Sequence, residues 1–517
     1  MKALEWLRLP QLCIVLLGLT GSFLIWSMTE LYGTGVSPDA VVYVSVARNL
    51  NQEHAYTPFD GRPMVLWPPV YPTVISVPAI LGIDPLLAAR CLNAVLFGVL
   101  VILSGLWLQA QVRRQILAVV ASLAVLCSYP LATVSRFAWT EPLYLFLMLV
   151  LLRFIWRTRH ILVWHRAFAL GALTATACLT RYAGVALIPC ILAAVWFTAA
   201  SRNSRLRNSG IYLATSILPL AAWLTRNYLV SSTLAGDRSG AAGSPMLSLY
   251  RSVSTLSLWL MPDAVPRPIK LVVLGIVGLV LFGVAVFVIR SHLRLSGDLS
   301  GLASYALLPG LALAHILELI LVASASVLEP INDRLLSPVF IPMVWFALIS
   351  ADRILDIGPS RAAKWLQAFL LVVTVSWLGY SGWRVFDSWR LTTAQGAGGF
   401  ATRDWRESDL TVHLVNHPSD HKMLSNAPAA LYYLTNLVSD VAPRRSRDSS
   451  RGADADEIAR IQSLLQERPC LDLVWFNKHP STDVFTIPEL AEYFRVDTVI
   501  LLSGGSIHQL SSKYNNQ

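Results

Sequence analysis

The stretch PQLCIVLLGLTGSFLIWSM, residues Pro10–Met28, decides the fold class of this chain because it contains no charged residue. As an α-helix, a run of this length crosses the roughly 30 Å hydrocarbon core of a bilayer at about 1.5 Å per residue. Lys2 and Arg8 precede the run, and no small-residue cleavage site follows it. We therefore expect an uncleaved first membrane span rather than a signal peptide.

The composition of the whole chain agrees with this first span. Of 517 residues, 55% are apolar and 14% are charged, and the mean hydropathy is +0.55. Soluble globular domains carry about 25% charged residues, so the composition excludes a soluble cytosolic enzyme and a disordered scaffold. The six cysteines show no CxxC spacing, which indicates neither a disulfide framework nor a zinc site.

Further apolar segments of roughly 17 to 25 residues recur along the chain. They lie near 86–109, 115–133, 137–155, 166–180, 183–200, 209–229, 269–289, 302–325, 334–351 and 365–386. The sequence thus predicts an all-α polytopic membrane protein with about eleven transmembrane helices. Pro69–Leu81 is apolar but short and bounded by proline, which favours a partly embedded segment.

The net charge of +10 indicates which loops of the membrane protein face the cytoplasm and does not indicate a nucleic-acid partner. Basic residues recur in short groups between apolar segments: Arg113–Arg114, Arg153–Arg166, Arg202–Arg207, Arg290–Arg294 and Arg353–Lys364. Cytoplasmic loops of membrane proteins are enriched in Lys and Arg, and alternating crossings place all these groups inside if the N-terminus is inside. We expect a multi-pass protein of the cytoplasmic (inner) membrane with a cytoplasmic N-terminus.

Two domains follow from this topology. Residues 1–386 form the transmembrane domain, with outer loops at 29–68 and 230–268, and residues 387–517 form a small extracytoplasmic α/β domain. In the second domain, β-rich runs (Thr411–Val415, Leu471–Phe476 and Thr498–Leu502) mix with helical patterns (Asp454–Gln466 and Pro488–Phe494) and an exposed loop (Arg444–Arg451).

Ionisable residues near the outer membrane face are the candidates for chemistry, because an unpaired charge in hydrocarbon costs several kcal/mol. They are Asp39, Arg48, Arg136, Glu141, Arg181, Arg226, His315, Glu318, Glu329, Asp333 and Arg334. In the first outer loop, Ser37 or Asp39 could cap a short helix on which Asp39 and Tyr43 share one face. The apolar face of that helix would consist of Val42, Val46 and Leu50.

Several motifs resemble those of a known superfamily in their order. They are Asp39-x-x-x-Tyr43-x-x-x-Ala47, Pro68-Pro69-x-Tyr71-Pro72, Ser135–Pro142, Leu179–Gly184, Thr225–Tyr228, Asn332–Pro338 and Leu424–Leu434. Together they resemble family-39-type membrane glycosyltransferases of the GT-C superfamily, which includes protein O-mannosyltransferases and the aminoarabinose transferase acting on lipid A. The chain departs from many relatives at Ala40, where they have Glu, and it lacks the Trp-Trp-Asp motif of oligosaccharyltransferase catalytic subunits.

The resemblance implies inverting transfer of a sugar from a polyprenyl-phosphate donor to a glycan, lipid or protein acceptor outside the cytoplasm. It assigns catalysis to Asp39, and a carboxylate there could take the proton from an attacking hydroxyl. The leaving lipid phosphate calls for an arginine or a divalent cation. Arg334 is the first candidate for this contact, with Arg181 or Arg226 as the second.

The remaining site candidates each have an alternative explanation. Tyr43 is a candidate substrate contact or an interfacial aromatic residue. Glu141 contacts substrate or metal, or is a first-turn carboxylate favoured by the helix dipole. His315 and Glu318 lie three residues apart on one helix, so they could ligate a divalent metal ion or simply hydrogen-bond to each other. The sequence implies no other cofactor.

Two other functions compete with sugar transfer. A transporter or flippase for lipid-linked sugars would show internally symmetric halves and charges along a path, but no internal repeat is evident. A structural partner whose outer domain recruits other proteins would depend on residues 387–517 and not on Asp39. The bilayer and the lipid-linked donor are the expected partners, and the sequence leaves the sugar open.

Overall fold

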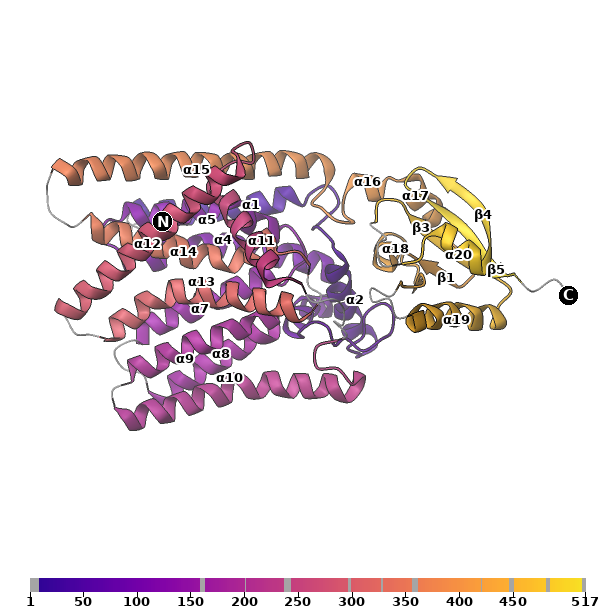
Figure 1. Ribbon diagram of the computed structural model, residues 1–517, viewed down its shortest axis with the longest axis horizontal. Coiled ribbons are helices and arrows are strands. Elements are labelled where there is room, and N and C mark those ends of the chain that lie inside the picture. Colours follow the sequence, from indigo (N-terminus) through magenta and orange to yellow (C-terminus); the bar gives the residue numbers. More distant parts are fainter. Residues whose placement is uncertain are drawn as a thin grey trace. The chain divides into compact units, whose positions relative to one another are not determined.

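A computed structural model describes residues 9–158, 163–199, 201–236, 243–295, 299–326, 329–355, 361–419, 421–445, 451–479 and 484–513. Contacts divide the chain into two compact units. The helical unit comprises Met1–Met28, Val65–Val74 and Ala89–Leu391, and the mixed unit comprises Thr29–Met64, Ile75–Ala88 and Thr392–Gln517. Figure 1 labels most of the elements of both units. The sequence-based boundary at residue 387 stays a prediction, and contacts group the first outer loop with the C-terminal tail.

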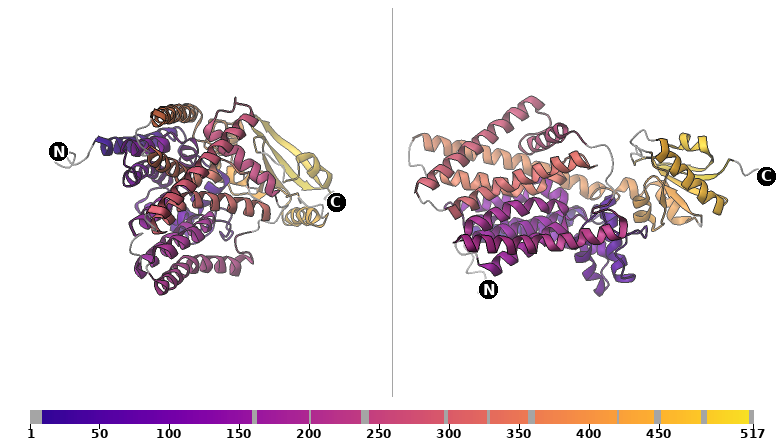
Figure 2. Two further views of the ribbon diagram at one scale, coloured as in Figure 1. Left: turned by 60° about the vertical axis from the view of Figure 1, so that its left-hand side comes forward. Right: turned by 60° about the horizontal axis from the view of Figure 1, so that its bottom comes forward.

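The helical unit consists of helices that run side by side (Figures 1 and 2). They are α1 (Leu9–Met28), α3 (Val70–Ser76), α4 (Pro85–Gln109), α5 (Ile116–Leu126), α6 (Tyr129–Ser135), α7 (Glu141–Thr158), α8 (Trp164–Thr180), η2 (Tyr182–Ala186), α9 (Leu187–Thr198), α10 (Arg202–Ser231), α11 (Pro245–Leu260), α12 (Arg267–Leu295), α13 (Leu299–Ala325), α14 (Asp333–Ile354) and α15 (Arg361–Gln395). Helices therefore occupy every segment for which the sequence predicted a membrane span.

Not all of these helices have the length and composition of a span. Within the described residues, six are long and apolar enough, namely α1, α4, α12, α13, α14 and α15, and the pair α5 and α6, bent by 54°, makes a seventh if it counts as one span. The predicted number of eleven is not confirmed. Helix α7 has 18 residues but carries Glu141, Arg153 and Arg157, and α9 has only 12 residues.

Glycines allow the helices of this unit to approach closely. A Cβ added to Gly98 on α4 would lie 2.5 Å from the carbonyl oxygen of Gly18 on α1. A Cβ on Gly171 of α8 would likewise lie 2.8 Å from the carbonyl oxygen of Tyr212 on α10. Small residues at such crossings let backbones pack where no hydrophobic effect drives association, as in a membrane.

The mixed unit contains one sheet and several short helices. Its helices are α2 (Pro38–Gln52), η1 (Val77–Leu81), α16 (Arg403–Arg406), α17 (Asp409–Asn416), α18 (Pro428–Thr435), α19 (Arg451–Glu467) and α20 (Ile487–Tyr493). Its strands are β1 (Met423–Ser425), β2 (Asp440–Val441), β3 (Leu471–Phe476), β4 (Phe494–Leu502) and β5 (Gly505–Ser512), in the order β2-β1-β3-β5-β4. The β1 strand is parallel to β2 and β3, whereas β5 is antiparallel to β3 and β4.

Most elements predicted for the tail are confirmed. The predicted run Leu471–Phe476 is β3, and Thr498–Leu502 lies within β4. Helix α19 covers the pattern Asp454–Gln466, and α20 covers the pattern Pro488–Phe494 except for Phe494, which begins β4. The strand predicted at Thr411–Val415 is wrong, because that segment lies in helix α17. Residues 446–450 of the predicted Arg444–Arg451 loop lie outside the described residues.

Candidate active site

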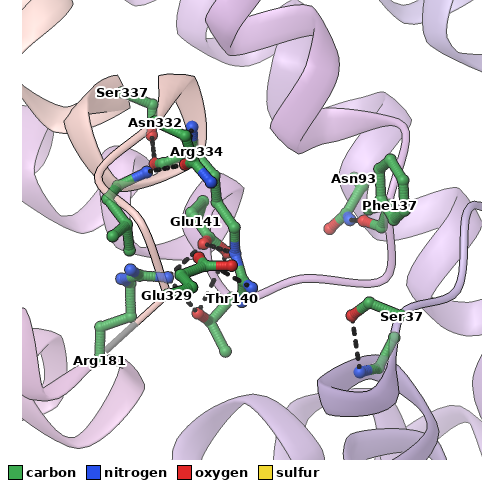
Figure 3. A network of polar contacts seen from close by, with 12 residues as sticks. Ser37, Asn93, Phe137, Thr140, Glu141, Arg181, Glu329, Asn332, Arg334 and Ser337 are labelled. Carbon is green, nitrogen blue, oxygen red and sulfur yellow. Dashed lines mark hydrogen bonds and ion pairs between the residues drawn. The ribbon is translucent and has the colours of Figure 1, made fainter. Parts of the chain in front are cut away.

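The centre of the candidate site is Glu141, the first residue of α7. Its side chain is completely buried, and burial of an unpaired carboxylate would cost several kcal/mol. Two arginines compensate this charge. The Glu141 Oε1 atom accepts a hydrogen bond from Arg181 Nη1 and another, at 2.6 Å, from Arg334 Nε. Figure 3 shows both guanidinium groups directed at the same carboxylate.

Local structure fixes where each arginine stands. Arg181 lies in the break between α8 and η2, with an extended backbone (φ −146°, ψ 132°), and its N–H donates to the Ala177 carbonyl oxygen. Arg334 lies in the first turn of α14. The Asn332 side chain caps that helix by accepting from the backbone N–H groups of Arg334 and Leu335 at 3.0 and 3.2 Å.

Further groups hold the Arg334 guanidinium. It lies 4.1 Å from the ring centroid of Trp139, and its Nη1 atom is 3.5 Å from Glu329 Oε1. The Trp139 ring stacks in turn on Phe137 at 4.1 Å. Arg334 is therefore held by a carboxylate at its Nε atom and by an aromatic face, which fixes the plane of the guanidinium. A guanidinium of fixed orientation is well suited to bind phosphate.

Asp333, next to Arg334, belongs to a different set of contacts. Its Oδ1 atom accepts from Trp259 Nε1 at 2.6 Å, and its Oδ2 atom is 4.0 Å from Arg384 Nη2. Arg384 also donates to the carbonyl oxygen of Leu258 at the end of α11. These bonds tie α11, α14 and α15 together. Asp333 and Arg334 are adjacent in one motif but belong to two separate clusters of contacts.

The predicted pair His315 and Glu318 lies on α13. Glu318 Oε2 is 3.9 Å from His315 Nδ1, and His315 Nε2 is 2.9 Å from the Leu335 carbonyl oxygen. Because a carbonyl oxygen only accepts, Nε2 is the donor in this hydrogen bond, and in the neutral imidazole Nδ1 is then an acceptor.

At 3.9 Å the contact between His315 Nδ1 and Glu318 Oε2 is too long for a direct hydrogen bond, so the geometry establishes neither a hydrogen-bonded pair nor a metal site. No group of three or more His, Cys, Asp or Glu residues that could hold a metal occurs in the described part of the chain. Within the described residues, no third His, Cys, Asp or Glu side chain joins His315 and Glu318 to form such a group. Arg181 also interacts electrostatically with both, and its positive charge opposes a cation.

Asp39 and Tyr43 lie on α2 in the mixed unit. Of the two predicted caps, Ser37 is the N-cap, and its side chain accepts from the Ala40 N–H at 3.4 Å. Asp39 is half-buried in the first turn, and Tyr43 is buried. The predicted apolar face is confirmed for Val42 and Val46, which are buried.

Arg226 makes its described contacts with neighbours on α10. Its guanidinium lies 4.9 Å from the ring centroid of Trp223, and its Nη1 atom donates to Asn227 Oδ1 at 3.1 Å. Asn227 in turn donates to the carbonyl oxygens of Val65 and Leu234. The structure therefore joins Arg181 and Arg334 at one carboxylate, whereas Arg226 belongs to another group of contacts.

Trp139 and Asn332 also belong to the site, although neither residue was predicted to do so. Asn332 precedes an apolar helix and is a favoured N-cap residue, so its role was readable from sequence. For Trp139, the only signal in the sequence was its position in the motif Ser135–Pro142. Its contact with Arg334 depends on how α7 packs against α14, which periodicity does not reveal.

No family model matches the sequence, and no curated protein matches it. Solved structures do match. ArnT from Cupriavidus metallidurans in the apo state superposes with a TM-score of 0.61 at 13% identity over 98% of both chains. The same protein bound to undecaprenyl phosphate gives 0.58 at 12% identity over 96% of this chain and 97% of that one.

A third match is the archaeal oligosaccharyltransferase AglB from Archaeoglobus fulgidus, in complex with an inhibitory peptide and a dolichol-phosphate. Its TM-score is 0.52 at 11% identity over 98% of this chain and 75% of that one. At such low identities the likeness shows the fold. The chain has the GT-C fold.

Proposed function

We propose that this GT-C chain is an inverting membrane glycosyltransferase that moves a sugar from a polyprenyl phosphate to a glycan, lipid or protein acceptor on the outer face of the cytoplasmic membrane. The observation that carries the proposal is the pair of guanidinium groups, Arg181 and Arg334, held on the buried carboxylate of Glu141. Two structures of the same fold, ArnT and AglB, were solved with undecaprenyl phosphate and with a dolichol-phosphate.

The reaction needs one base and one stabilising positive centre. The acceptor hydroxyl oxygen forms a bond with the anomeric carbon while the bond from that carbon to the phosphate oxygen breaks. Asp39 takes the hydroxyl proton. Negative charge develops on the leaving polyprenyl phosphate, and Arg334 and Arg181 stabilise it. Tyr43, Glu141 and Arg226 are the further proposed substrate-binding residues.

Glu141 has a second role in this proposal. Two arginines that converge on one point repel each other, and the carboxylate between them offsets this repulsion. Because Glu141 orients both side chains before substrate arrives, little reorganisation is needed during reaction. The same arrangement would serve a flippase that only binds lipid-linked sugars, so bond formation itself must be measured.

The test uses a strain that lacks this protein and membranes prepared from it. We expect one glycosylated polyprenyl phosphate to accumulate, and purified wild-type protein added to these membranes to convert it to free polyprenyl phosphate. Asp39→Asn should reduce the conversion to a small residual rate, and Arg334→Lys should slow it by about 10- to 100-fold, because lysine cannot reproduce the planar fork of arginine. A lipid profile identical to that of the parent strain would contradict the proposal, and normal conversion by Asp39→Asn would remove this base.

A further inference from the structure

Backbone hydrogen bonds fasten the residue that precedes the N-cap of α2. The Val36 N–H donates to the Gly398 carbonyl oxygen at 3.2 Å, and the Phe400 N–H donates to the Val36 carbonyl oxygen at 2.8 Å. Val36 and Gly399 thus form an isolated parallel bridge. All four residues belong to the mixed unit. Asp39 follows three residues after Val36, so this bridge fixes the chain just before the proposed base.

The segment on the other side of the bridge depends on glycine. Gly396, Gly398 and Gly399 have φ values of +98°, +123° and +59°, a region that other residues avoid. A Cβ on Gly396 would lie 2.3 Å from the Ala401 carbonyl oxygen and 2.9 Å from Tyr32 Cδ2. No side chain fits there without a shift of the backbone.

Tyr32 adds a second fastening beside the bridge. Its ring lies against Gly396, and its hydroxyl donates to Glu407 Oε1 at 2.5 Å. Tyr32 and Val36 flank the turn that leads into α2, and both contact the chain after α15. We call Tyr32, Val36, Gly396, Gly398–Phe400 and Glu407 the clamp.

The far end of α2 is held in the same unit. Arg48 Nε donates to Asp84 Oδ2 at 2.9 Å. After the helix, the Phe59 ring stacks on Tyr432 of α18 with centroids 4.7 Å apart. Because the far end of α2 is held, the helix cannot follow a shift of the clamp as a rigid body. Such a shift therefore changes the position of the first turn of α2, where Asp39 lies.

We propose that the clamp positions the Asp39 carboxylate for proton transfer, so that the C-terminal part of the chain acts on the sugar-transfer step through Val36. This inference rests on the proposed function, in which Asp39 is the base. A displacement of about 1 Å at a reacting group can cost on the order of 100-fold in rate. The clamp residues are positioning residues and touch no substrate in this scheme.

The first test compares two glycine substitutions in the mixed unit. In Gly396→Ala the new Cβ collides with Ala401 and Tyr32, whereas in Gly61→Ala, also at positive φ (+72°), the Cβ meets nothing within 4 Å. We expect Gly396→Ala to lower kcat by about 10- to 100-fold with an unchanged KM for the lipid donor. Gly61→Ala should stay within about twofold of wild type, because it shares the backbone strain without the collision.

A second test uses Glu407, where a conservative change is available. Glu407→Gln keeps an oxygen that accepts from the Tyr32 hydroxyl and should retain most of kcat. Glu407→Ala and Tyr32→Phe each break that bond and should lower kcat to a similar extent. If Gln and Ala at position 407 give equal rates, the hydrogen bond does not position the base.

A double-mutant cycle separates positioning from general loss of structure. Because the clamp acts through Asp39, adding Gly396→Ala to Asp39→Asn should leave the residual rate unchanged. An additive loss would overturn the inference and leave the proposed function standing. Full activity of Asp39→Asn alone would overturn both. Normal kcat in Gly396→Ala, with Asp39→Asn inactive, would overturn only the clamp.

Discussion

At the scale of single residues, Glu141 shows how a buried carboxylate can orient two arginine side chains. The helix that it begins could bury a neutral residue at lower cost, yet the carboxylate holds Arg181 and Arg334 on one oxygen atom. Removing charges from water costs free energy, and only close partners of opposite charge offset this cost. Glu141 therefore orients the two arginines at the expense of the stability that a neutral residue would give α7.

Replacing Glu141 by Gln leaves two arginines without their shared counter-charge. We expect the free energy of unfolding to fall by about 3–5 kcal/mol, which is typical of breaking a buried ion pair, and sugar transfer to be lost. Thermal unfolding in detergent and the membrane conversion assay measure the two effects. Glu329→Gln is the control, because Glu329 is 40% exposed and contacts Arg334 at 3.5 Å. Equal melting temperatures for both variants would contradict this account.

The surroundings of His315 and Glu318 allow a prediction about whether sugar transfer depends on a metal ion. The nearby positive charge of Arg181 and the lack of a third His, Cys, Asp or Glu ligand within the described residues disfavour a metal ion at this pair. We therefore expect transfer to persist after dialysis of the purified protein against EDTA, and added divalent ions to leave the rate unchanged. His315→Ala should lower the melting temperature equally with and without EDTA. Activity that disappears with EDTA and returns with one divalent ion would instead identify the pair as metal ligands.

At the scale of elements, local patterns predicted helices well and failed where two local signals competed. Thr411–Val415 has the composition of a strand, but Ser408 caps a helix by accepting from the Thr411 N–H at 3.2 Å. Leu410 and Leu414, four residues apart, are both buried on that helix. The cap and the spacing are both present in the sequence, and in α17 they outweigh the β propensity of Thr411–Val415.

The candidate site was predictable only in its parts. Glu141, Arg181 and Arg334 were all identified from sequence, because charges are scarce in this chain. Their convergence was not, since Glu141 and Arg334 are separated by 193 residues and meet through helix packing. The role of Gly396–Phe400 could not be predicted for the same reason.

The crossing of α1 and α4 gives a prediction for element packing. Gly98→Val places a Cβ 2.5 Å from the Gly18 carbonyl oxygen, so the two helices must separate. We expect a melting temperature in detergent lower by several degrees or a loss of folded protein, measured by size-exclusion chromatography. Gly275→Val on α12 is the matched control, because its Cβ meets nothing within 4 Å. A similar loss in both variants would point to a general intolerance of valine at helical glycines.

At the scale of the whole molecule, the two units are not consecutive in sequence. The mixed unit takes Thr29–Met64 and Ile75–Ala88 from the N-terminal part of the chain and Thr392–Gln517 from its end. The buried core of the sheet, from Leu424 to Leu510, comes entirely from the C-terminal piece. The sheet has its own core, whereas α2 depends on contacts with residues far along the chain.

Removal of residues 392–517 should therefore damage α2 as well as delete the sheet. We expect the truncated protein to insert into membranes, to become sensitive to protease between Thr29 and Met64, and to lose sugar transfer. A protein whose outer part only recruits partners would also lose its function on truncation, but Asp39→Asn would then leave it intact. Protease protection of Thr29–Met64 in the truncated protein would contradict the dependence of α2 on the tail.

The bond between Tyr32 and Glu407 also sets an order of events during synthesis. The two residues are 375 positions apart, and ribosomes add roughly 5–20 residues per second, so the partner of Tyr32 is made about 20 to 75 seconds after Tyr32 itself. During that interval the loop that carries Asp39 has left the ribosome without the contacts that hold it. A nascent chain would thus stay inactive until Glu407, which follows α15, has been made, and a product that stalled or terminated before this point could not begin to consume the lipid donor.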